Sequence, residues 1–155
     1  MCESLGAENQ GVLVHRDTYF NVAQGRLKLR EEKDGAAQLI AYERADLASQ
    51  RTSHYRLIDI GEPEELKAAL ATALGVRVVV AKERRLFLWE GNVRIHLDAV
   101  EGLGDFIEFE AVASEDSDLK VEEAQVKRLR KVFEINDADV IANSYCDLTM
   151  TGDGR

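Results

Sequence analysis

Alternation of charged and apolar residues is the strongest pattern in this chain. It occurs in three short stretches, Gly25–Arg30, Arg94–Asp98 and Phe106–Glu110. Successive side chains of a β-strand point to opposite faces of a sheet, so each stretch has one apolar and one charged face. Two interpretations follow. The commoner one is a half-buried sheet whose charged face meets water; the other is a set of charged faces that converge on a cavity able to hold a polyanion and its metal ions.

The wider pattern predicts seven β-strands and two main helices. The strands, bounded by Gly, Asn and Asp, are expected near 12–20, 26–32, 37–44, 52–60, 76–89, 92–99 and 105–113. Helices are expected near 63–74, where Pro63 suits the first position, and near 117–134, with a short one over 137–142. Sequential antiparallel strands with few helices predict an α+β protein, a meander that curls towards a closed barrel.

Composition fits one globular domain, which we place at 1–150 with a frayed tail at 151–155. The formal charge of −9 argues against a general nucleic-acid binder, because a phosphate backbone favours excess Lys and Arg. No apolar run is long enough to cross a membrane, so no membrane partner is expected. Cys2 and Cys146 have neither metal-ligand spacing nor a disulfide framework, which predicts a reducing, cytoplasmic setting.

Sorting the charges by strand face gives a candidate site. The cations expected to face inward and to bind phosphates are Lys28, Arg30, Arg44, Lys82, Arg84 and Arg94. The carboxylates expected beside them are Asp98, Glu108 and Glu110, an all-oxygen set that suits Mg²⁺ or Mn²⁺. Such a set favours phosphoryl or nucleotidyl transfer, although no single residue can be assigned as catalytic. His96 is expected to be a polar wall residue, and His15 and His54 to lie on the surface.

Several motifs resemble the CYTH family in content and order. They are Asp17-Thr18-Tyr19-Phe20, Gly25 to Arg30, Ala81 to Arg84, Arg94 to Asp98, Leu103 to Glu110 and Ser144 to Leu148. That family groups class IV adenylyl cyclases with thiamine triphosphatases and tripolyphosphatases, the triphosphate tunnel metalloenzymes. The motifs are most similar to the cyclase branch. The resemblance implies an antiparallel barrel of about eight strands whose tunnel binds a divalent metal and ATP, tripolyphosphate or thiamine triphosphate.

One family feature is absent from this sequence. The family begins with a strand carrying Glu-x-Glu-x-Lys and then a helix, whereas Leu5-Gly6-Ala7 here resembles the turn at the end of that helix. The resemblance therefore implies seven strands, weaker metal binding and free sheet edges that favour a homodimer. It leaves the reaction open between cyclisation of ATP to cyclic AMP and pyrophosphate and hydrolysis of a triphosphate. The alternatives are a catalytically impaired polyphosphate- or nucleotide-binding module and a truncated form of an active enzyme.

Overall fold

The structure is a computed structural model, and it describes residues 1–43 and 54–152. It confirms an α+β protein built on a seven-stranded antiparallel sheet. The strands are β1 (Glu8–Phe20), β2 (Arg26–Glu32), β3 (Ala37–Glu43), β4 (His54–Asp59), β5 (Val76–Trp89), β6 (Val93–Val100) and β7 (Gly104–Ala111). The helices are α1 (Pro63–Leu74), α2 (Lys120–Val132) and α3 (Tyr145–Thr151), and short 3₁₀ turns cover Glu3–Leu5 and Asp137–Asp139.

The order of the strands is β4-β3-β2-β1-β5-β6-β7. The prediction of one continuous meander is therefore wrong, since β4 and β5 are consecutive in the chain but not neighbours in the sheet. The helix α1 is the reason: it carries the chain from the edge strand β4 back to the middle, where β5 pairs with β1. These two strands are the longest, with 13 and 14 residues, and they join two smaller meanders.

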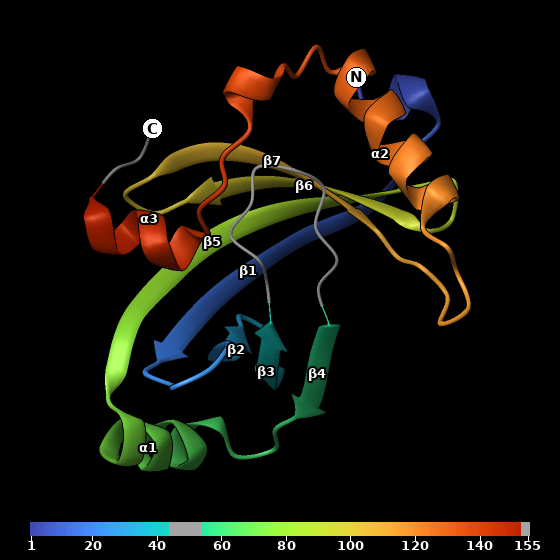
Figure 1. Ribbon diagram of the computed structural model, residues 1–155. Coiled ribbons are helices and arrows are strands. Elements are labelled where there is room, and N and C mark those ends of the chain that lie inside the picture. Colours follow the sequence, from blue (N-terminus) through green and yellow to red (C-terminus); the bar gives the residue numbers. More distant parts are fainter. Residues whose placement is uncertain (44–53, 153–155) are drawn as a thin grey trace.

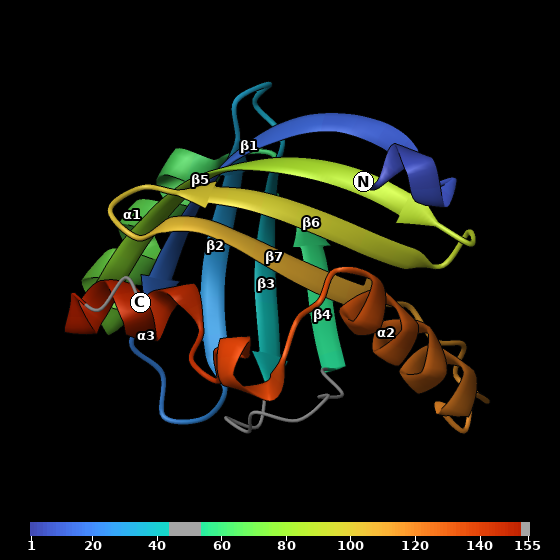
Figure 2. The same cartoon turned by 90° about the horizontal axis from the view of Figure 1, so that it is seen from above.

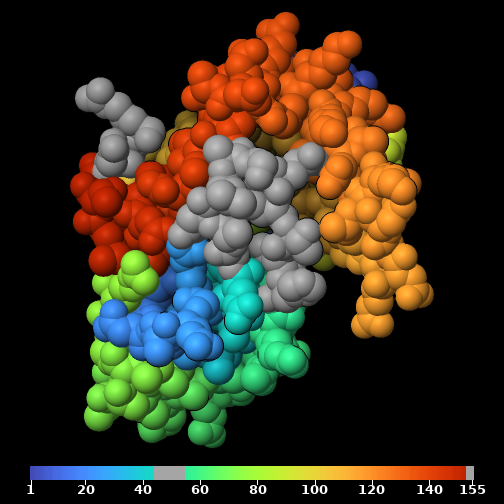
Figure 3. Space-filling model, in the orientation of Figure 1, coloured from blue at the N-terminus to red at the C-terminus, as the bar shows by residue number. Residues whose placement is uncertain are grey.

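The sheet curls but stays open. In Figures 1 and 2 the strands β2, β3 and β4 run across the direction of β5, β6 and β7, so that the sheet has an inner and an outer face. Figure 3 shows β2, β3 and α1 in the lower half of the molecule, with the orange surface of α2 above them. Register shifts in the β1–β5 pair, such as the one between Asn9 and Gly11, allow the bend. Within the described residues, β4 and β7 form the two edges.

An apolar cluster covers the outer face of β5, β6 and β7. Phe87, Trp89 and Ile95 point outward there and pack against Leu129 of α2. Leu129 belongs to the apolar stripe that predicted this helix, and its neighbour Phe133 packs against the same cluster. The N-terminal turn adds Cys2, so the outer layer joins the N-terminal end of the chain to α2.

A second cluster closes one end of the inner face. Cys146 and Leu148 of α3 pack there against Tyr19, Val80 and Val100 of the sheet. This helix was not among the predicted elements, and the helix expected over 137–142 is only a 3₁₀ turn. Cys2 and Cys146 lie in different clusters and both are free. In the part of the chain that is described, no helix has the length and apolar character needed to cross a membrane.

Candidate functional site

The strand register brings most of the predicted charged residues to the inner face. Residues opposite each other on paired strands share a face, as do alternate residues along one strand. The inner face defined in this way contains Lys28 and Arg30 of β2, Lys82 and Arg84 of β5, Arg94 and Asp98 of β6, and Glu108 and Glu110 of β7. Arg44 lies outside the described residues. Their parity was readable from the sequence, but the strand order that makes the faces meet was not.

Asp17 of β1 organises the first group of charges. Lys28 Nζ donates to Asp17 Oδ2 at 2.7 Å, and Arg30 donates from Nε and Nη2 to both carboxylate oxygens, each at 2.8 Å. The Asp17 side chain is 2% exposed. Burial alone would raise the pKa of Asp17, but the charges of Lys28 and Arg30 outweigh it and hold the pKa well below its usual range.

Asp98 of β6 organises the second group. Arg84 makes a bidentate pair with it, Nε to Oδ1 at 2.7 Å and Nη2 to Oδ2 at 2.6 Å. The Tyr145 hydroxyl donates to Asp98 Oδ2 at 3.0 Å, and Lys82 Nζ lies 3.5 Å from the same oxygen. Arg84 also reaches Glu108 Oε2 at 3.0 Å. Burial, with the positive charge of Arg84 nearby, lowers the pKa of Lys82 to about 8.

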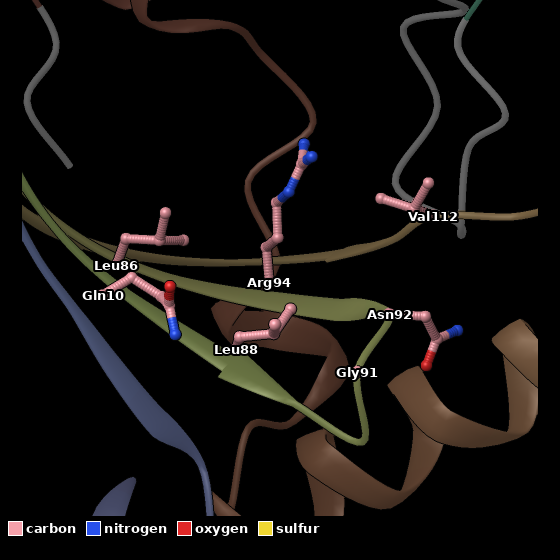
Figure 4. Close-up of a pocket in the computed structure, with 7 residues that line it drawn as sticks. All are labelled: Gln10, Leu86, Leu88, Gly91, Asn92, Arg94 and Val112. Carbon is pink, nitrogen blue, oxygen red and sulfur yellow. The ribbon is translucent and has the colours of Figure 1, made fainter.

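The opposite end of the inner face is more open. Arg94 pairs with Glu110 at 3.1 Å, and His96 Nδ1 lies within hydrogen-bond distance of Glu108 Oε2 at 3.2 Å. A cavity of about 330 Å³ lies beside Arg94. It is lined by Gln10, Leu86, Leu88, Gly91, Asn92, Arg94 and Val112. Figure 4 shows Leu86, Leu88 and Arg94 projecting from β5 and β6 towards the same side.

The prediction that His15 lies at the surface is wrong. His15 is 3% exposed and lies on β1 opposite Glu32 of β2 and Lys82 of β5. Both ring nitrogens are buried and have no hydrogen-bond partner among residues 1–43 and 54–152, and Glu32 Oε1 is 3.6 Å from Nε2. His96 is a buried polar wall residue as predicted. The side chain of His54 lies outside the described part of the structure.

Whether the inner face can hold a metal ion depends on how its carboxylates are arranged. Across residues 1–43 and 54–152, no group of three or more His, Cys, Asp or Glu side chains is arranged to hold a metal ion. Arg84 engages both oxygens of Asp98, whereas Glu108 and Glu110 are 39% and 32% exposed. The described carboxylates therefore do not form a complete metal site by themselves. Their role as metal ligands stays a prediction.

Sequence reasoning missed three residues that shape the site. Asp17 belongs to one of the motifs quoted above, but only the structure shows that Lys28 and Arg30 both bind it. Tyr145 and Asp147 come from α3, and Asp147 Oδ2 accepts a hydrogen bond from Arg26 Nη2 at 2.7 Å. A Ser followed three residues later by an acidic residue predicts a helix start, and Ser144 and Asp147 form such a capping box.

Comparisons with known proteins bear on the fold of the chain. The family model described as the CYTH domain matches residues 2–145. No curated protein matches the chain. Among solved structures, the PH1012 protein of Pyrococcus horikoshii OT3 is 23% identical with a TM-score of 0.83, over 95% of this chain and 88% of that one. A conserved hypothetical protein of Pyrococcus furiosus is 19% identical with a TM-score of 0.82, over 94% and 88%.

A third solved structure has a described activity. The HpAC1 protein from Hippeastrum, described as a candidate adenylyl cyclase with a dominant triphosphatase activity, is 14% identical. Its TM-score is 0.66, over 97% of this chain and 88% of that one. At these identities the three likenesses show the fold.

Proposed function

Because this chain belongs to the CYTH family, we propose that its inner face binds the triphosphate group of a small molecule and hydrolyses it. The observation that carries the proposal is the convergence of buried and half-buried cations from two parts of the sheet. Lys28 and Arg30 come from β2, and Lys82 and Arg84 come from β5. A triphosphate has several negative charges along its length, so cations from separate strands can neutralise it together.

The carboxylate partners hold the two arginines ready for phosphate. Asp17 fixes Arg30, and Asp98 fixes Arg84, each through the Nε and Nη2 atoms. A guanidinium has five N–H donors, so each arginine keeps donors outside these pairs that can reach a phosphate oxygen. Preorganisation of this kind reduces the side-chain entropy that binding costs.

A divalent metal belongs to the proposal because proteins of this family are metal-dependent. The described carboxylates do not complete a metal site, so we propose that Mg²⁺ or Mn²⁺ enters as the metal complex of the triphosphate. Phosphate oxygens then supply part of its oxygen ligands. Glu108 and Glu110, the more exposed carboxylates of the set, are the residues that we expect to face the ion.

The substrate that fits best carries an organic group. Beside Arg94, the cavity offers the apolar side chains of Leu86, Leu88 and Val112 and the amides of Gln10 and Asn92. Apolar walls with a few polar groups are typical of sites for organic ligands. ATP and thiamine triphosphate therefore rank ahead of inorganic tripolyphosphate. We favour hydrolysis over cyclisation because the similarly folded HpAC1 protein is described as having dominant triphosphatase activity.

A binding module without turnover is the second candidate. The observation that favours it is the engagement of Asp98 by Arg84, which leaves the described residues without a group of three potential metal ligands. Such a module would bind the triphosphate through the same cations.

One experiment distinguishes the candidates. The protein is incubated with ATP, tripolyphosphate and thiamine triphosphate, each with Mg²⁺ and with Mn²⁺, and phosphate, pyrophosphate and cyclic AMP are assayed alongside binding by calorimetry. Release of phosphate supports the triphosphatase, whereas cyclic AMP with pyrophosphate supports the cyclase. Binding without any product supports the module, and the absence of binding contradicts all three.

Two variants locate the site in the same experiment. Arg30→Gln should weaken binding, because Arg30 lies on the inner face. Arg85→Gln is the control, since Arg85 is exposed on the outer face of β5 next to Arg84. Equal loss of binding in both variants would contradict an inner-face site.

Location and assembly remain further predictions. Both cysteines are free and buried, which agrees with a cytoplasmic protein. Edge strands such as β4 and β7 can pair with the edge strand of another chain, which supports the prediction of a homodimer. Size-exclusion chromatography with light scattering would test it.

A further inference from the structure

The imidazole of His15 is a buried polar group that has no part in the triphosphate contacts proposed above. Its side chain is 3% exposed, and within the described part of the chain neither ring nitrogen has a hydrogen-bond partner. A buried polar group without a partner costs about 1–3 kcal/mol, so its presence calls for a physical reason. Its position on the inner face of β1 suggests one.

His15 lies between the two groups of cations. Arg30 and Glu32 face it from β2, Lys82 and Arg84 face it from β5, and Asp17 lies two residues along its own strand. Burial and the positive charge of Arg30 lower the pKa of His15 to about 3, despite the opposing effect of Asp17. The ring is therefore neutral in the free protein at ordinary pH, with one nitrogen as a donor and the other as an acceptor.

We propose that His15 is a further binding residue of the triphosphate site, which hydrogen-bonds to a phosphate oxygen and takes up a proton from solvent as the polyanion binds. This inference rests on the proposed function. A triphosphate that contacts both Arg30 and Lys82 must cross β1, where the adjacent carboxylate of Asp17 repels it. His15 offers the bound anion an N–H group on the same strand.

The direction of the pH effect follows from charge. Negative phosphate oxygens beside the ring favour its protonated form and raise its pKa in the complex. Binding then includes proton uptake, so affinity rises as the pH falls towards the pKa of the bound ring. Lys82, with a pKa of about 8, is already protonated at a pH of about 6.5 and adds little there.

Calorimetry with tripolyphosphate tests the inference. Binding is measured at a pH of about 6.5 in two buffers of different ionisation enthalpy, which gives the number of protons taken up. His15→Gln keeps hydrogen-bonding groups but cannot titrate, whereas His15→Leu removes both. Protons on the ligand itself contribute equally to every protein, so the difference between variants isolates His15.

The expected results separate a binding role from a structural one. The unaltered protein should take up a measurable fraction of a proton more than His15→Gln, whose affinity should stay within a few-fold. His15→Leu should bind roughly tenfold more weakly, the effect of one hydrogen bond to a charged group. The control Arg16→Gln alters the next residue of β1, which is exposed on the outer face, and should match the unaltered protein in both quantities.

Two outcomes would overturn the inference, and they are distinguishable. Equal proton uptake in the unaltered protein and His15→Gln would show that His15 does not titrate on binding, while the binding itself would still support the proposed function. Failure of the unaltered protein to bind tripolyphosphate, ATP and thiamine triphosphate alike would show that both proposals are wrong.

Discussion

Asp17 is the residue on which the inner face depends most. It is buried and negatively charged, and Lys28 and Arg30 supply three hydrogen bonds to it. In a buried cluster of this kind each charge is tolerable only because the others are present. In the proposed complex Asp17 orients Arg30 but also competes with phosphate for Lys28 and Arg30. We expect the competition to dominate, so that Asp17 affects stability and ligand binding in opposite directions.

Replacing Asp17 with Asn should reveal this opposition. The variant Asp17→Asn leaves Lys28 and Arg30 without their carboxylate, and we expect the free energy of unfolding to fall by about 3–5 kcal/mol. Added tripolyphosphate should raise the stability of the variant more than that of the unaltered protein, because the anion replaces the missing charge. Urea unfolding with and without tripolyphosphate measures both effects.

A matched control is Asp105→Asn, because Asp105 is exposed on β7. It should change the stability by no more than about 0.5 kcal/mol. If ligand stabilises Asp17→Asn no more than Asp105→Asn, then Asp17 does not compete with phosphate.

The depressed pKa of Asp17 makes part of the stability dependent on pH. At neutral pH the carboxylate is charged in the folded and unfolded states alike. At a pH below about 3.9, the pKa of an aspartate in the unfolded chain, Asp17 binds a proton in the unfolded state but not in the folded state. The free energy of unfolding therefore falls by about 1.4 kcal/mol per pH unit. Asp17→Asn lacks this loss. Urea unfolding at several pH values should therefore show the stability difference between the two proteins shrinking as the pH falls below about 4, and a constant difference would contradict the charge cluster.

Which face of the sheet a side chain lies on could be predicted where the strands are regular. Alternation placed Lys28, Arg30, Lys82 and Arg84 on common faces of their strands, and the register agrees. The burial of His15 was not predictable, because its neighbours Glu32 and Lys82 come from strands whose pairing with β1 depends on the topology. A charge pattern along one strand contains no information about which strand lies beside it.

At the scale of elements, α3 has more effect on the site than its seven residues suggest. Its first turn brings Tyr145 to Asp98 and Asp147 to Arg26, while Cys146 and Leu148 anchor it in the inner cluster. Hydrophobic periodicity needs a longer window to be recognised, so a helix of two turns escaped prediction. The helices 63–74 and 117–134 were long enough to be found, and α1 has the predicted bounds.

Removing the packing contacts of α3 should lower both the stability of the protein and its affinity for tripolyphosphate. Leu148 is 3% exposed, so Leu148→Ala should cost about 2–5 kcal/mol of stability by leaving a cavity. It should also reduce the affinity for tripolyphosphate, because Tyr145 then no longer fixes Asp98 and its partner Arg84. Met150→Ala in the same helix is the control, since Met150 is exposed and its loss should cost less than about 1 kcal/mol. Unchanged affinity in folded Leu148→Ala would show that α3 does not position the site.

On the scale of the whole molecule, the pair β1–β5 joins two meanders that both contribute charged residues to the inner face. The class and the number of strands could be predicted, since each strand has its own pattern and turn residues. The strand order could not, because the sequence of α1 specifies a helix but not the position to which the helix returns the chain. The inner face exists only because β5 returns to pair with β1 and not with β4.

A ligand that bridges the two meanders should stabilise both at once. Tripolyphosphate contacts Lys28 and Arg30 on one side and Lys82 and Arg84 on the other in the proposed complex. At about 100 times its dissociation constant, linkage raises the free energy of unfolding by about 2.7 kcal/mol. Amide hydrogen exchange should therefore slow in β2 and in β5 together, although β1 separates these strands in the sheet. Protection limited to β5 and β6 would mean that the anion binds only the Arg84–Asp98 group, and that the two halves of the inner face do not form one site.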